Sequence, residues 1–484
     1  MIITNRLKNQ HLLWRAGFGP TASDAPSLGN ISQKKMWEQL IKSSSKSPDK
    51  INVASNRFDG LMQGIKDIEK MKELSKEDKK ELRRQSADDL KNLNVSWMNE
   101  MITGKDQLRE KMSLFWHGHF ACRVINIYFQ QELLDVIRQN ALGNFGDLLK
   151  GVSKSASMLQ FLNNQQNKKQ HPNENFAREV MELFTMGRGN YTEEDVKEAA
   201  RAFTGWGFNL QGEFVFREKQ HDDGGKTFLG KTGNYNGDDI IDILLEQSQT
   251  SVFITKKLYR FLVNEDIDST KVDWLAKRFH QSNYDIKKLL TDIFTADWFY
   301  EEKNIGTQIK SPIVLLAGIR RILPLQLSDD LSQLLFQKAL GQTLFYPPNV
   351  AGWPGGKNWI DSSTLMLRLR IPQIIAANET INIQTKPDDD VMMGMSSEER
   401  MAAKMNKDYA DKGVNVTVDW NSVINMFDNV SRDQLLQQIS DTLLQSQSRV
   451  NTTVLEKYLK TDTRENYIKS AMINVMSTPE YQLC

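Results

Sequence analysis

The chain has 484 residues, of which 39% are hydrophobic and 25% charged, an ordinary composition for a protein that can bury a sizeable core. Its 62 basic residues almost balance its 61 acidic residues, so net charge gives no general reason to expect nucleic acid or an anionic membrane as a partner. Its two cysteines are too few for a disulfide framework. We expect Cys122 to be a buried apolar residue and Cys484 to be mobile.

The beginning of the chain shows no pattern typical of export. The stretch MIITNRLKNQHLLWRAGFGP has no basic start followed by an apolar run, as a secretory signal would. No segment approaches the roughly 18 consecutive apolar residues of a transmembrane helix. By default, these features predict a soluble, cytoplasmic protein.

Most segments carry the apolar period of an α-helix. Between residues 193 and 203, an apolar stripe runs from Val196 to Phe203 at helical spacing. Thr192 followed by Asp195 resembles a capping box at the start of this helix. The sequence therefore predicts a mainly α fold, a multi-helical globular core with a small β-hairpin insertion. The same helical period recurs at 253–263, 272–281, 286–300, 311–322 and 331–340.

Two segments depart from the helical pattern. Residues 209–230 have short alternating apolar positions and several glycines, which predict the small β-hairpin with a turn-rich return. Residues 344–359 contain prolines that forbid a regular helix. Because Trp353 and Trp359 must pack against something, we expect this second segment to be an ordered loop beside the core and part of a pocket wall.

The chain divides into three parts by composition. Residues 1–375 are predicted to form the helical core domain. Residues 376–418 are acidic and rich in methionine and are predicted to be a flexible insertion. Residues 419–484 return to the helical pattern, and we expect these helices to dock on the core.

The first candidate site is the stretch FWHGHFACR at residues 115–123. On a helix, His117 and His119 would lie about 200° apart, whereas in an extended segment they would share a face. Two imidazoles on one face can hold a divalent metal, and a non-covalent haem is a weaker alternative. The other interpretation is one core histidine and one surface histidine. Arg123, close behind, is a candidate substrate-binding residue.

The second candidate is the segment at 171–192. Glu179 and Glu182 are candidate general bases, because burial would raise a carboxyl pKa towards neutrality. Arg178 is a candidate for binding an anionic group of a substrate. A surface ladder of ion pairs is the alternative, and such a ladder would contribute little.

The third candidate is HDDGGKTFLG at residues 221–230. His221 and Asp222 are candidate catalytic residues, and Lys226 could hold an anion beside the backbone N–H groups of a glycine turn. The stretch lacks the full phosphate-loop pattern, so a P-loop is rejected. We expect the three candidates to converge on one solvent-reachable hollow.

Six stretches occur together in this chain: LLWRAGFGPT (12–21), KMSLFWHGHF (111–120), NENFAREVMELFTMGRGNYTEEDVKEAARAFTGW (173–206), HDDGGKTFLG (221–230), KSPIVLLAG (310–318) and FYPPNVAGWPGGKNWID (345–361). By these stretches the chain resembles the bacterial family catalogued as domain of unknown function 1800. The family name records no settled activity. The resemblance implies export in many relatives, which leaves the compartment open, and a partner resembling the alkaline phosphatase and sulfatase group.

Two hypotheses about function remain open on these residues. The first is a hydrolase-type enzyme, metal-dependent or acid–base, that acts on an anionic substrate. The second is a non-catalytic binding or scaffold protein that works with a partner enzyme, with the same polar cluster fixing the fold and presenting a surface.

Overall fold

A computed structural model describes residues 2–54, 75–209, 211–327, 329, 332–377, 416–446, 450 and 452–484. Most of the predicted insertion at 376–418 lies outside the described residues. Among the helices in these ranges, none is long and apolar enough to cross a lipid bilayer.

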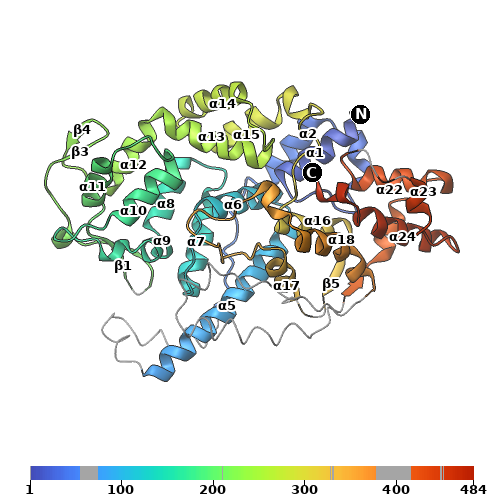
Figure 1. Cartoon of the computed structure of the whole chain (residues 1–484), viewed down its shortest axis with the longest axis horizontal. Helices are drawn as coiled ribbons and strands as arrows, with labels where there is room; N and C mark the ends of the chain where they lie inside the picture. Colours follow the sequence, from blue (N-terminus) through green and yellow to red (C-terminus); the bar gives the residue numbers. More distant parts are fainter. Residues whose placement is uncertain are drawn as a thin grey trace.

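The described chain is mainly α-helical, as the sequence predicts. Figure 1 shows the helices arranged along one long axis, with the small hairpins at one end and the last helices at the other. The helices are α1 (Asn5–Ala16), α2 (Gln33–Ser43), α5 (Lys76–Thr103), α6 (Gln107–His119), α7 (Ile127–Asn140), α8 (Phe145–Lys154), α9 (Ala156–Phe161), α10 (Glu174–Glu179), α11 (Glu193–Ala202), α12 (Gly237–Glu246), α13 (Ser248–Leu262), α14 (Ser269–Gln281), α15 (Ile286–Phe294), α16 (Pro312–Ile322), α17 (Ser332–Ala339), α18 (Ser362–Ala377), α21 (Trp420–Asn425), α22 (Leu435–Leu443), α23 (Thr452–Glu456) and α24 (Arg464–Met476).

Local sequence signals set the ends of several helices. The capping box predicted at Thr192 is present, because the Thr192 side chain accepts from the Asp195 N–H and the Asp195 carboxylate accepts from the Thr192 N–H. Helix α10 does not end at Glu179 but continues as one turn of π-helix, η3 (Val180–Thr185). Such turns are rare and often lie at functional sites.

The strands form three antiparallel pairs. Strands β1 (Trp206–Phe208) and β2 (Phe214–Phe216) pair, as do β3 (Lys226–Phe228) and β4 (Lys231–Gly233). The single hairpin predicted at 209–230 is therefore two short hairpins in succession. The third pair joins β5 (Leu325–Leu327) to β6 (Val416–Val418). The last residues of the predicted insertion therefore form a strand that pairs with a strand of the core.

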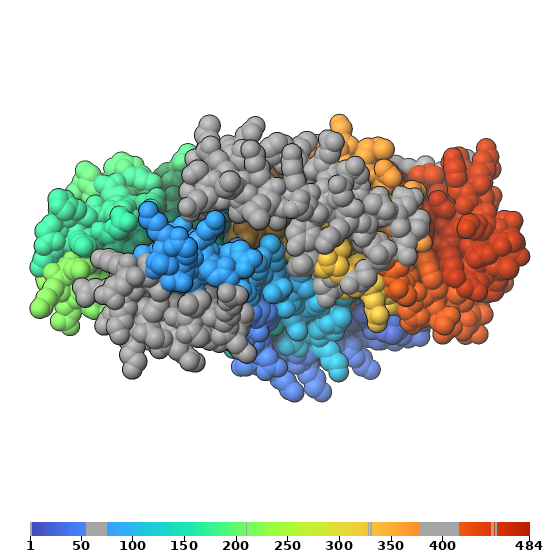
Figure 2. All heavy atoms as spheres, turned by 90° about the horizontal axis from the view of Figure 1, so that it is seen from below, coloured from blue at the N-terminus to red at the C-terminus, as the bar shows by residue number. Residues whose placement is uncertain are grey.

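The buried apolar residues form two clusters that meet at α1 and α6. One cluster fills the space among α6 and the helices from α8 to α15. The other cluster lies among α5, α16, α18, α22 and α24. The space-filling view in Figure 2 shows the same division, with the middle of the chain at one end of the molecule and the C-terminal helices at the other. Helices α1 and α6 contribute apolar side chains to both clusters and so connect them.

The loop at 344–359 lies against the end of α6. A Cβ atom placed on Gly352 would stand 2.3 Å from the Gly118 carbonyl oxygen, so the two backbones touch. The ring of Trp353 lies 5.6 Å from that of His117, and Trp359 is buried. The segments FWHGHF and VAGWPGG thus approach each other closely at Gly118 and Gly352.

Candidate functional site

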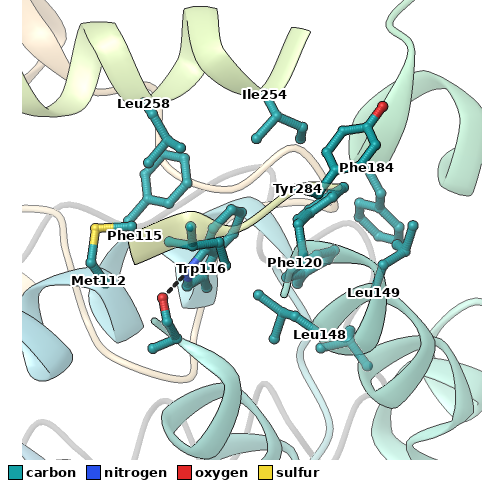
Figure 3. Packing of buried hydrophobic residues seen from close by; sticks show 14 of the residues in the cluster. Met112, Phe115, Trp116, Phe120, Leu148, Leu149, Phe184, Ile254, Leu258 and Tyr284 are labelled. Atoms are coloured by element: carbon teal, nitrogen blue, oxygen red, sulfur yellow. Dashed lines mark hydrogen bonds between the residues drawn. The ribbon is translucent and has the colours of Figure 1, made fainter. Parts of the chain in front are cut away.

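The segment around His117 is a helix in the middle of the apolar core. Phe115, Trp116 and Phe120 are all buried, and the Trp116 indole donates to the Ala141 carbonyl at 3.1 Å. Figure 3 shows these rings packed against α8 and α13, on the residues Leu148, Leu149, Ile254 and Leu258. Any chemistry in this segment must therefore take place at the edges of a closely packed helix.

His117 acts as an anchor for the loop at 344–359. Its Nε2 accepts a hydrogen bond of 3.1 Å from the N–H of Phe345, a residue held at φ +68°. Its ring packs edge-on against Trp97, 5.2 Å away. Burial lowers the pKa of His117 to about 3, so the ring is neutral and its accepting nitrogen is committed to the backbone.

His119 points to the other side of α6, where it meets a lysine. Its Nε2 lies 3.1 Å from the Phe184 carbonyl and donates to it, which leaves Nδ1 as an acceptor. The Nζ of Lys257, on α13, donates to that Nδ1 at 3.0 Å and lies 3.3 Å from the Leu183 carbonyl. Helix α6, the π-helical turn and α13 thus converge at one pair of side chains.

The π-helical turn explains why these carbonyls are available. The last carbonyls of any helix lack an intrahelical N–H partner, and the wide π turn places those of Leu183 and Phe184 towards α6 and α13. Thr185 closes the turn by donating to the Val180 carbonyl at 2.7 Å. The side chains of His119 and Lys257 complete the hydrogen bonding of the helix end.

The Lys257–His119 pair carries at most one positive charge, and that charge is on the lysine. Burial lowers the pKa of Lys257 to about 8, and the side chain is only partly accessible. Burial, followed by the charge of Lys257, holds the pKa of His119 well below its ordinary value. At neutral pH the lysine is therefore mostly protonated and the imidazole is neutral, and the lysine becomes an unprotonated base as the pH rises past about 8.

The predicted metal pair is not formed. His117 and His119 lie on a helix, face different neighbours and give nitrogens to Phe345 and Phe184. Within the described ranges, no three His, Cys, Asp or Glu side chains lie close enough to hold a metal ion. The helical geometry is the physical reason, since residues two apart on a helix diverge by about 200°.

The second candidate segment is a partly buried carboxylate pair beside the π-helical turn. Burial, followed by the nearby Glu182 charge, raises the pKa of Glu179. The carboxylate of Glu179 makes no hydrogen bond or ion pair with any described residue. Glu182 is held ionised: Tyr191 donates to it at 2.7 Å and Arg188 at 2.6 Å, so its pKa is lowered. Arg178 is already engaged by Glu174 and Glu193.

The third candidate segment is a self-contained turn, not an open anion site. Asp222 accepts two hydrogen bonds from the Arg201 guanidinium, which lowers its pKa to about 2. The Lys226 ammonium donates to the carbonyls of Asp222 and Gly224 at 2.5 and 2.9 Å, and the side chain is buried. The Nδ1 of His221 lies 2.9 Å from the Thr204 carbonyl. These residues hold the hairpins onto α11.

The structure does not gather the predicted residues into one hollow. Arg123 lies 5.6 Å from the Tyr346 ring, on the side of the 344–359 loop, and His221 lies among the hairpins. Of the predicted set, His119 is brought to the π-helical turn, whose first half carries Glu182.

Several buried cations were missed by reading the sequence. Lys257 lies in an ordinary amphipathic helix, three positions after Ile254 and beside the buried stripe. Lys111 likewise stands between Leu108 and Leu114 at helical spacing. A lysine at an apolar helical position was the available signal. The further missed cations are Arg15, Lys310 and Arg368.

Comparison with protein families gives one match. The family model described as "Protein of unknown function (DUF1800)" matches residues 11–483. The chain belongs to the DUF1800 family. No curated protein and no solved structure matches the chain. The family description assigns no reaction to the chain.

Proposed function

We propose that this DUF1800 protein is a hydrolase-type enzyme of the acid–base kind, with Lys257 as the proton-accepting group and His119 as its partner. The single observation that supports the proposal is the hydrogen bond of 3.0 Å from Lys257 Nζ to His119 Nδ1 at the end of the π-helical turn. This proposal replaces the metal-dependent version of the hydrolase hypothesis, whose ligand pair the geometry does not supply.

The proposed chemistry follows from which atoms are free. Unprotonated Lys257 can take a proton from a water molecule or a substrate hydroxyl. The resulting ammonium keeps one N–H on His119 and one on Leu183, and offers the third to a developing negative charge. His119 stays neutral and positions the amine, because its Nε2–H is held by Phe184. An anionic substrate would be stabilised by the ammonium that forms.

The test is hydrolysis of p-nitrophenyl acetate, phosphate and sulfate by the full chain. We expect turnover of at least one ester, rising with pH and with a midpoint near the Lys257 pKa of about 8, since only the unprotonated amine is a base. Lys257→Met should lower the rate by about 100-fold or more.

Lys256→Met is the matched control, because Lys256 is exposed on the same helix and should leave the rate unchanged. Competitive acetylation followed by mass spectrometry gives the Lys257 pKa independently of any substrate. Failure of all three esters to turn over, or equal rates in the two lysine variants, would contradict the hydrolase role.

The non-catalytic alternative is favoured by one surface feature. Val454 on α23 and Tyr458 after it are exposed large apolar side chains at the outer end of the molecule. Large apolar side chains that stay exposed are available for contact with another protein. The partner would be the phosphatase- or sulfatase-like protein that the family resemblance implies. Tyr458→Ser should weaken its co-elution with the chain, and unchanged co-elution would contradict this surface.

A further inference from the structure

Four cationic side chains are buried where the two apolar clusters meet. Arg15 on α1, Lys111 on α6, Lys310 before α16 and Arg368 on α18 are each at most 3% exposed. None of them forms an ion pair with an Asp or Glu side chain in the part of the chain that the structure describes. Such burial is rare for lysine and arginine unless an anion accompanies them.

Contacts link Lys111 and Lys310 to Trp14, Arg368 to Lys310, and Arg15 to the main chain of Cys484. The Nζ of Lys310 lies 3.8 Å from the centre of the Trp14 ring, and the Nζ of Lys111 donates to the Trp14 carbonyl at 3.0 Å. Arg368 donates from Nη1 to the carbonyl of Lys310 itself at 2.9 Å. Arg15 follows Trp14 in α1. Burial lowers the pKa values of Lys111 and Lys310, and the charges of Arg15 and Arg368 lower them further, so the four charges act on one another.

The negative charge near these four side chains is smaller than the positive charge they can carry. The charge at Cys484 acts on Arg15, Lys111 and Lys310, and the Cys484 main-chain oxygen accepts from Arg15 at 2.7 Å. Even with that charge counted, the two guanidinium groups alone outnumber the negative charge, before either lysine is protonated. Desolvation alone costs several kcal/mol for each uncompensated buried ion.

The guanidinium groups also keep unused donors. Nε and Nη2 of Arg368 are buried and have no hydrogen-bond partner, and the same holds for Nε and Nη1 of Arg15. Nε and Nη2 are the pair by which two other arginines of this protein hold a carboxylate, Arg138 with Glu110 and Arg278 with Asp292. Arg368 presents the same fork to no described group.

Water could satisfy these donors but could not balance their charge. A buried water accepts hydrogen bonds from N–H groups, yet carries no net charge. An oxyanion supplies both hydrogen-bond acceptors and negative charge. Its oxygens accept from a guanidinium fork, and its charge offsets the neighbouring ammonium groups. The unpaired Tyr481 hydroxyl, whose ring lies 3.9 Å from Lys310 Nζ, is a further buried donor beside the same group.

We propose that the group of Arg15, Lys111, Lys310 and Arg368 encloses a small oxyanion of the phosphate or sulfate class, held by the Arg368 fork and the two ammonium groups. The anion is taken up as the chain folds and joins α1, α6, α16 and α18. This site is separate from the Lys257–His119 pair and does not depend on the proposed reaction.

The experiment measures the anion content and thermal stability of the full chain. Protein is refolded in chloride, phosphate or sulfate at one ionic strength, desalted, and then denatured to release the anion for ion chromatography. We expect a single retained oxyanion per chain, and a saturable rise in Tm of roughly 3–6 °C at a hundredfold excess over Kd. Phosphate and sulfate arms distinguish the two oxyanions.

Arg368→Met and Lys310→Met should lose both the retained oxyanion and the rise in Tm. Arg260→Met and Lys277→Met are the matched controls, because both side chains are exposed and should leave both readouts unchanged. Retention of chloride alone, absence of any retained oxyanion, or an equal rise in Tm in the Arg368→Met and Arg260→Met variants would overturn the proposal. If an interior variant fails to refold, anion release from the native wild-type chain decides by itself.

Discussion

At the scale of single residues, the same side-chain type has different roles according to its neighbours. His117 and His119 are two positions apart, yet one binds a backbone N–H and the other a lysine. Both are neutral, since burial lowers their pKa values. Glu179 and Glu182 likewise diverge, because Glu182 alone has a tyrosine and an arginine as donors. Environment, more than residue type, decides what each can do.

His117→Ala tests the anchoring role. The change leaves the Phe345 N–H without an acceptor in the interior and opens a cavity beside Trp97. Together these effects should lower the free energy of unfolding by about 3–5 kcal/mol, measured by urea denaturation. His171→Ala, at an exposed position, should change it by less than about 0.5 kcal/mol. A small loss for His117→Ala would show that the loop does not depend on this bond.

The residue scale also shows where sequence reading was incomplete. The histidines stand out in the sequence because they are scarce. The buried lysines and arginines do not, because the sequence does not distinguish them from the rest of its 62 basic residues. Cys484, expected to be mobile, is buried and exchanges two backbone hydrogen bonds with Gln308. These bonds hold the segment after α24 against the cations, a contact no local pattern indicates.

At the scale of elements, close backbone contacts fix the helices and the loop at 344–359. Gly318 on α16 faces Trp14, and a Cβ there would stand 2.2 Å from the ring. Gly352 faces Gly118 in the same way and has φ +81°. Glycine is required at both positions, since any side chain would displace the partner element.

Gly352→Ala tests the contact between the loop and α6. The added methyl would meet the Gly118 carbonyl oxygen and would also strain a backbone that favours glycine. We expect a loss of about 2–4 kcal/mol in unfolding free energy. Gly355→Ala is the control, because it has a positive φ but open space around its Cβ, and should cost only about 1 kcal/mol. Equal losses of unfolding free energy in the two variants would show that the steric contact at Gly352 does not contribute.

At the scale of the whole molecule, stability should depend on the charge buried between the two apolar clusters. Burial lowers the pKa of Lys310 to about 7, whereas the unfolded chain has an ordinary lysine pKa. The groups facing it are Lys111, Arg368 and the charge at Cys484. Between these two pKa values the unfolded state binds the extra proton, so stability rises as the pH rises from about 7 towards 10.

Lys310→Met removes this dependence. In protein refolded in chloride, the wild-type chain should gain stability with pH more steeply than the variant, by up to about 1.4 kcal/mol per pH unit. The measurement is urea denaturation at several pH values between 7 and 9. Refolding in phosphate should reduce the difference, because a bound oxyanion favours the protonated lysine. Parallel pH profiles for the two chains would contradict this account.

The sequence by itself determined the class of fold, the positions of many helices and the family, because apolar period, caps and breakers act over a few residues. The stretches that carry the family resemblance also contain three residues of the proposed oxyanion site, Arg15, Lys111 and Lys310. Only the tertiary structure decided which side chains meet: Lys257 with His119 beside a π-helical turn, and four buried cations linked through Trp14, Lys310 and Cys484. Those meetings depend on packing between segments far apart in the chain, and local periodicity carries no information about such distances.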